Sequence, residues 1–428
     1  TDADADHTKQ PYLRYSFKSD ATSVKTAKDT GADSHFMTTV PDDAYDDNPA
    51  ATSTETVDVT KIVASAKCED MKFWSPDSPN LYDVYTVLKD SEGNVLDVQK
   101  TTTGFRKVEY DINDGGLKIN DQPVWLTGYA QCSTNEWAVI GVANDWLQDL
   151  DMQWIKESNS NFIRWMHVAP KPSQIRSGDK YGVVSACPAG DKEADVDGRA
   201  WDQRVEAMRD AMIYFRNSPS VIFWEAGNNA VTAAHQQEMT DLKNTLDPNG
   251  ERFCGCRTIS STDQIQAADY VGTMLNRHAS NAKASMAAIK KYVPIMETEY
   301  AREEAPRRVW DDFSPPDYDY RNKWLGSGAS KTDGYDIHDL TSEDFSLVDA
   351  RAYNEFYSDR VGGLSGNDYY SAAAMMVWSD SNMHNRNTGT ENCRTSGKVD
   401  PVRIKKDVFY TMQTIQSTTP KLHIVGHW

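Results

Sequence analysis

The sequence predicts an α/β fold, a (β/α)8 TIM barrel preceded by an incomplete immunoglobulin-like β-sandwich. Eight short apolar segments recur between residues 123 and 380, and helical stretches lie between most of them. An earlier, shorter region alternates apolar and polar residues, as antiparallel strands with one face in solvent do.

Composition divides the chain into three parts. Residues 1–55 are polar, rich in Asp, Ala, Thr and Ser, and are interpreted as the loop-rich remnant of a β-domain. Residues 56–112 contain the alternating segments, with SEGN as a hairpin turn, and are predicted to form the sandwich. Residues 113–428 carry the repeated strands and helices and are predicted to form the barrel.

The barrel elements follow from the lengths and periods of apolar runs. Helices are predicted at 145–158 and 201–217, and in the second of these apolar residues recur at helical spacing. The stretch 301–343 is long, aromatic and rich in Asp and Pro, and we expect it to lie over the barrel mouth. The eight strands are predicted at 123–130, 161–168, 182–188, 221–228, 252–259, 269–275, 293–300 and 372–380.

Charge and hydropathy exclude two classes of protein. The 428-residue chain has a formal charge of -19, which argues against a general attraction to nucleic acid. No run of about 18 apolar residues occurs, so no membrane-spanning helix is expected. The first ten residues lack a signal-peptide pattern, so either a signal has been removed or the chain is a fragment.

No metal site is predicted. The six cysteines are sparse and form no CxxC pair, and no cluster of His, Cys, Asp and Glu has metal-ligand spacing. Cys254 and Cys256 share one face of a predicted strand and are interpreted as small core residues.

Two strands are predicted to deliver carboxylates to the barrel mouth. VIFWEAGNN (221–229) and PIMETEYAR (294–302) each carry Glu at the end of an apolar run. Barrel enzymes keep their chemistry at the C-terminal ends of the strands. Two carboxyl groups that flank one bond are the machinery of glycoside hydrolysis, so these segments favour a sugar-cleaving site.

Several segments together resemble glycoside hydrolase family 2, which contains β-galactosidases, β-glucuronidases and β-mannosidases. The resemblance covers about residues 70–428 and implies an exo-acting hydrolase of terminal β-linked sugars, most similar to β-galactosidases and retaining in mechanism. The jelly-roll domain with which the family begins is absent or partial here. The matching segments are FWSPDSPNLYDV (73–84), GFRKVEYD (104–111), INDQPVWLTGYA (119–130), NFIRWMHVAP (161–170), NSPSVIFWEAGN (217–228) and PIMETEYA (294–301).

The resemblance also implies the roles of individual residues. Glu299 matches the nucleophile that attacks the anomeric carbon, with a buried structural ion pair to an Arg as the alternative. Tyr300 could hydrogen-bond that carboxylate, with packing as the alternative. Asn229 falls where the family has its acid/base Glu, and an amide cannot donate and recover a proton at a useful pKa. Three explanations stay open: another acid, a carbohydrate-binding pseudoenzyme, or a Glu replaced deliberately to trap a substrate complex.

Glu225 and Glu297 are the first candidates for the missing acid. Side chains alternate along a strand, so Glu225 would share a face with Asn229 and lie about 13 Å below it. Glu297 would lie about 7 Å below Glu299. Each could instead be an interior carboxylate with a partner, and an inverting enzyme with a different acid is a further alternative. The remaining candidate acids are Glu136, Asp191, Glu193, Glu303, Glu304 and Asp380.

Further side chains near strand ends are predicted to line the pocket. The resemblance implies that Arg164 and His167 support the carboxylates and contact the sugar, with a core histidine as the alternative for His167. It also implies that Asn228 hydrogen-bonds the 2-hydroxyl. Trp378 is predicted to be a stacking floor for a sugar ring, with core packing as the alternative. The predicted substrate-binding set is Arg164, His167, Asn228, Asn229, Asn276, Tyr300, Trp378 and Arg308.

The expected partner is an oligosaccharide or polysaccharide. Arg302, Arg307 and Arg308 follow Glu299 in an otherwise acidic chain, and guanidinium groups suit carboxylate or sulfate. We therefore hypothesise an anionic glycan, with pairing to nearby loop acids as the alternative. A polysaccharide substrate slightly favours a periplasmic or extracellular location. No cofactor is predicted except a divalent cation near the pocket, which some family members bind. The oligomeric state is not predicted.

Overall fold

The computed structural model of the protein describes residues 70–114, 116–132, 144–190, 194–229, 231–257, 261–273, 292–300, 370–380 and 397–424. It also gives the backbone of two short strands, β1 (Ser23–Val24) and β2 (Glu55–Thr56), which pair antiparallel.

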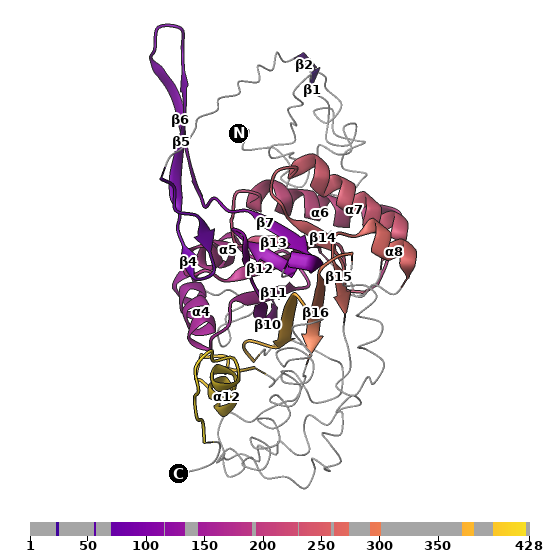
Figure 1. Ribbon diagram of the computed structural model, residues 1–428. Helices are drawn as coiled ribbons and strands as arrows, with labels where there is room; N and C mark the ends of the chain where they lie inside the picture. The colour runs from indigo at the N-terminus through magenta and orange to yellow at the C-terminus, as the bar shows by residue number, and fades with distance from the viewer. Residues whose placement is uncertain are drawn as a thin grey trace, which may run out of the picture.

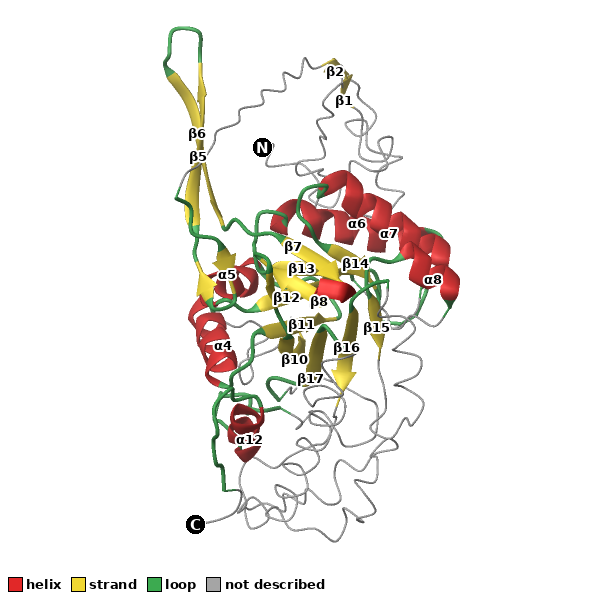
Figure 2. Ribbon diagram, viewed as in Figure 1, coloured by secondary structure: helices red, strands yellow, loops and turns green. Residues whose placement is uncertain are grey.

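Eight parallel strands form the barrel, as the sequence predicted (Figures 1 and 2). Their order in the sheet is β14-β13-β12-β11-β10-β17-β16-β15. β14 and β15 stand at the two ends of this order, and two backbone hydrogen bonds beside them bring the barrel near closure. The Asp269 N–H donates to Cys254 O at 2.7 Å, and the Gly272 N–H donates to Cys256 O at 3.1 Å. The strands are β10 (Leu126–Cys132), β11 (Phe162–Met166), β12 (Val184–Pro188), β13 (Val221–Glu225), β14 (Phe253–Gly255), β15 (Val271–Thr273), β16 (Ile295–Tyr300) and β17 (Ala372–Met376).

Helices cover the outer face of the strands. The predicted helices at 145–158 and 201–217 correspond to α4 (Asp145–Glu157) and α6 (Arg199–Phe215). Alternate strand residues such as Trp165 and Trp224 point outward and pack with the apolar faces of these helices. The other helical elements are η1 (Ile112–Asp114), α5 (Pro172–Tyr181), α7 (Ala233–Leu246), α8 (Thr262–Ala267) and α12 (Asp407–Ile415). Within the described residues, none of the helices could span a membrane.

The barrel interior is a second apolar core. Phe162, Phe223 and Tyr270 fill it, with ring centroids 5.2–6.1 Å apart for the Phe162–Phe223 and Phe223–Tyr270 pairs. A small antiparallel sheet packs against the same core through residues such as Leu117, and Trp74 joins it. That sheet comprises β7 (Val108–Asp111), β8 (Gly116–Ile119) and β9 (Gln122–Pro123).

A long hairpin precedes this small sheet. β5 (Tyr82–Lys89) and β6 (Val95–Thr103) pair antiparallel around the predicted SEGN turn, where Asp90 accepts a hydrogen bond from the Asn94 amide at 2.8 Å. The hairpin projects away from the barrel (Figure 1), and it is the extended part of the predicted sandwich that the structure describes. Two shorter strands, β3 (Trp74–Ser75) and β4 (Ser78–Pro79), lie at its base.

Candidate active site

One buried arginine joins the C-terminal ends of three strands. Arg164 lies on β11 and is completely buried. Its Nε donates to Glu225 Oε2 at 2.7 Å, and its Nη2 also donates to Glu225 Oε1. The same guanidinium donates to Asn228 Oδ1 and to Glu299 Oε1, both at 3.0 Å. Burial opposes the charge of Arg164, but Glu225 and Glu299 outweigh it and raise its pKa.

Glu299 is held by two guanidinium groups. Arg257 Nη1 donates to Glu299 Oε1 at 3.1 Å, in addition to the bond from Arg164. The Glu299 residue is 3% exposed, so these charges are poorly screened. Two adjacent positive charges favour the ionised carboxylate, which is the form that a nucleophile requires. The geometry is compatible with the role that the resemblance implies for Glu299, and it also contains the buried ion pair with arginine that is the structural alternative.

Arg257 is a site residue that sequence reasoning missed. It follows β14, and its Nη2 donates to Asn229 Oδ1 while its Nη1 donates to Glu299. Its backbone N–H donates to Gly227 O at 3.0 Å, which fixes the end of β14 against the turn after β13. A signal was present in the sequence, because Arg257 lies near the end of a predicted barrel strand.

The two alternative acids are both interior carboxylates. Glu225 is 1% exposed and accepts from Arg164 through both oxygens, and a carboxylate in such a pair is ionised and has no proton to give. Glu297 is also 1% exposed, and its Oε2 accepts from the Thr273 hydroxyl at 2.7 Å. These contacts favour the structural alternative for Glu225 and Glu297.

Regular strand geometry ends earlier than the sequence argument assumed. β13 stops at Glu225, so strict alternation does not extend through the turn to Asn229. Glu225 and Asn228, three residues apart, both reach the guanidinium of Arg164. The expected separation of 13 Å between Glu225 and Asn229 assumed a continuous strand, and that assumption was wrong.

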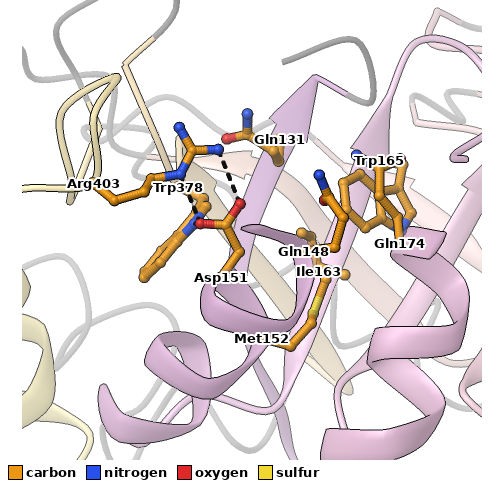
Figure 3. A pocket seen from close by; sticks show the side chains of 9 residues that line it. All are labelled: Gln131, Gln148, Asp151, Met152, Ile163, Trp165, Gln174, Trp378 and Arg403. Carbon is orange, nitrogen blue, oxygen red and sulfur yellow. Dashed lines mark hydrogen bonds and ion pairs between the residues drawn. The ribbon is translucent and has the colours of Figure 1, made fainter. Parts of the chain in front are cut away.

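Trp378 lies between the barrel and its helices. It is 1% exposed, its Nε1 donates to Asp151 Oδ1 at 2.9 Å, and its ring packs against Tyr129 at a centroid distance of 5.1 Å. Figure 3 shows Trp378 and Arg403 converging on Asp151, beside a cavity of about 10 Å³ with room for roughly one water. The structure thus favours the core-packing alternative over a sugar platform.

Hydrogen bonds connect the loops that follow β12 and β13. Asp195 Oδ2 accepts from the Thr232 backbone N–H at 2.8 Å, and its Oδ1 lies 2.9 Å from His235 Nδ1. The His235 ring stacks on Trp201 at a centroid distance of 3.8 Å. These contacts join the loop that follows β12 to the start of α7, which comes after Asn228 in the chain.

The remaining predicted residues fall into two groups. His167 directly follows β11 and is partly exposed, whereas Asp380 is buried and paired with Lys406 Nζ at 2.9 Å, which indicates a structural role.

Among the described residues, no group of three or more His, Cys, Asp or Glu could hold a metal ion. Predictions outside the described residues concern Asn276, Arg302, Arg307, Arg308, the side chain of Tyr300, and the loop acids Glu136, Asp191, Glu193, Glu303 and Glu304.

Comparison with protein families agrees with this fold. Residues 7–106 match the model of glycosyl hydrolases family 2, and residues 110–308 match the TIM barrel domain of the same family. The chain belongs to glycosyl hydrolase family 2. The family resemblance drawn from the sequence is therefore confirmed.

Relatives of the chain include proteins named β-glucuronidase and proteins named β-galactosidase. A β-glucuronidase from Formosa agariphila is 33% identical over 86% of this chain and 35% of its own length. A β-galactosidase from Photobacterium profundum is 28% identical over 41% of this chain and 18% of its own length. The solved structure of a family 2 β-glucuronidase superposes with a TM-score of 0.69 at 32% identity, covering 84% of this chain and 35% of that one. The chain thus spans about a third of the length of such β-glucuronidases.

Proposed function

We propose that the chain carries the catalytic barrel of an exo-acting β-glycosidase that removes a terminal β-linked uronic acid. The observation that carries the proposal is the buried cluster in which Arg164 and Arg257 both donate to Glu299. This cluster lies at the C-terminal ends of the strands, where barrel enzymes bind substrate. Its charged carboxylate is suited to attack an anomeric carbon.

The choice of a uronide rests on the relatives. Three Formosa agariphila relatives that cover 83–86% of this chain are named β-glucuronidase or putative β-glucuronidase. Four relatives named β-galactosidase match 41–44% of the chain. A β-galactoside, the substrate expected from the sequence, remains the second candidate because those galactosidase relatives are 26–29% identical in the segments they match.

The proposed reaction is a double displacement. A Glu299 oxygen forms a bond to the anomeric carbon while the bond to the leaving oxygen breaks, giving a glycosyl-enzyme intermediate. Water then attacks the same carbon and releases Glu299, so the configuration is retained. Arg164 holds the nucleophile and Asn228 in one arrangement by bonding to both. Asn228 would contact the 2-hydroxyl of the sugar, as the family resemblance implies.

Asn229 also supports a second class of function. Without a carboxyl group at this position, the barrel could bind a glycan and not cleave it. An inverting enzyme with a different acid is the other alternative. The retaining enzyme, the inverting enzyme and the binding protein differ in their product. Retention gives the β-anomer first, inversion gives the α-anomer first, and a binding protein gives no product.

Dinitrophenyl β-glycosides provide the test, because their leaving group departs without protonation. We expect the purified protein to hydrolyse dinitrophenyl β-glucuronide faster than the corresponding β-galactoside, and proton NMR to show the β-anomer first. Glu299→Gln should abolish the reaction, whereas Arg216→Gln, an exposed change on α6's C-cap, should retain it. Glucuronide binding without hydrolysis would contradict the proposal and support the binding protein.

A further inference from the structure

Arg257 lies between the two positions that normally perform the chemistry of this family. One guanidinium nitrogen donates to Glu299, the proposed nucleophile, at 3.1 Å. The other donates to the side-chain oxygen of Asn229, the residue that the family resemblance aligns with the acid/base position. The Arg257 side chain is 9% exposed, so its charge acts in a largely water-excluded environment.

The chemical properties of arginine define what Arg257 can do there. Its guanidinium does not lose a proton in proteins, so it cannot act as a general acid. It can donate several hydrogen bonds and place a permanent positive charge beside a developing negative one. Fixed donors aimed at developing charge are among the largest contributions to catalysis, and losing one typically costs about 10²–10³-fold in rate.

We propose that Arg257 is a catalytic residue that stabilises the departing oxygen by charge and hydrogen bonding, in place of a proton donor. This inference rests on the proposed function. The acid/base position borders the glycosidic oxygen, because the general acid must reach that oxygen. A guanidinium bonded to Asn229 is therefore placed beside the same oxygen, with Glu299 on its other nitrogen.

The proposed step balances without a proton from the protein. Glu299 forms its bond to the anomeric carbon as the bond to the leaving oxygen breaks. The electron pair stays on that oxygen, which departs as an anion beside Arg257 and takes a proton from water afterwards. In the second half, water attacks the anomeric carbon, Glu299 leaves, and the proton of that water passes to solvent.

A substrate class follows from this chemistry. A leaving group that is never protonated in the transition state must be stable as an anion. Phenols meet this condition far better than sugar hydroxyls do, since a phenol has a pKa of about 10, as tyrosine does. We therefore infer that the preferred substrates are uronides of phenolic or similarly acidic alcohols.

The test uses aryl β-glucuronides that range from dinitrophenyl to unsubstituted phenyl. Arg257→Leu should lower kcat/KM for the phenyl glucuronide by about 10²–10³-fold and for the dinitrophenyl compound far less. Arg257→Lys, which keeps a charge, should fall between the wild type and Arg257→Leu. If Arg257 only positioned Glu299, its replacement would lower kcat/KM by the same factor for every leaving group. An equal loss across the series therefore overturns the inference.

A binding measurement separates this inference from the proposed function. The protein is titrated with 4-nitrophenolate in a calorimeter, at a pH above the pKa of 4-nitrophenol. This measurement does not require turnover. Arg257→Leu should weaken binding of this anion at least about tenfold, because a buried charge partner is lost. Unchanged phenolate affinity would overturn the inference even if hydrolysis is observed. Failure of Glu299→Gln to stop hydrolysis would overturn only the assignment of the nucleophile.

Discussion

Placing a carboxyl group at position 229 should restore little activity by itself. Arg257 already donates to the side-chain oxygen of Asn229. An adjacent positive charge lowers a carboxyl pKa by about 1–3 units from roughly 4.3. At pH 6 the protonated fraction of the new side chain would then be about 0.002–0.2%, against about 2% for a free Glu. Asn229→Glu should therefore gain less than about tenfold on phenyl β-glucuronide.

Removal of the guanidinium should release that acid. In Asn229→Glu combined with Arg257→Leu, the carboxyl group can hold a proton, and general acid catalysis contributes about 10²–10⁴-fold. We expect the double variant to exceed Arg257→Leu alone by about 10²-fold in kcat/KM for the phenyl compound, and by little for the dinitrophenyl compound. Asn229→Gln is the control, since it lengthens the side chain without adding an acid. A gain of about 10²-fold from Asn229→Glu alone would refute this reasoning.

Three further predictions concern the site and its support. Glu299→Gln should abolish turnover in assays with dinitrophenyl β-glucuronide while leaving the circular dichroism spectrum unchanged. Asp151→Ala should cost about 3–5 kcal/mol in urea unfolding, because it leaves the buried Arg403 without its carboxylate. Asp145→Ala, on the same helix but in an exposed pair, should cost less than about 1 kcal/mol, and equal costs would contradict this. Burial raises the pKa of Asp179 to about 6. The contribution of its protonated form to the free energy of unfolding is therefore fully present below pH ~4 and is lost as pH rises through ~6. Asp179→Asn should therefore gain about 2–3 kcal/mol relative to wild type between pH 4 and pH 7, and a constant difference between the two proteins would show that burial does not control this proton.

The barrel could be predicted because its signal is local. Each strand is an apolar run of the expected length, and the helical stretch between two such runs located α4 to within a residue at either end. The hairpin turn at SEGN was also identified, because turn residues separated two alternating segments. Such patterns reflect burial on one or two faces, which the residues themselves record.

The site was harder to predict because its contacts are not local. Arg257 joins Glu299 across 42 positions of sequence, and no spacing rule reveals such a pair. Trp378 was expected at the mouth, but β17 ends at Met376 and the chain then carries the ring toward Asp151. Glu225 could have been an acid or a structural anion, and its burial and its two bonds to Arg164 favour the second.

Trp74 has a practical consequence for dividing this protein into domains. It lies outside the segment that matches the barrel model, which begins at residue 110, yet it is completely buried against the barrel core. Its indole N–H donates to Asp179 O at 2.8 Å across 105 residues. An expression fragment cut at the family boundary would lose this side chain, a deletion comparable to a large-to-small change that costs about 3–5 kcal/mol. Fragments of the barrel should therefore begin before Phe73 if they are to remain folded.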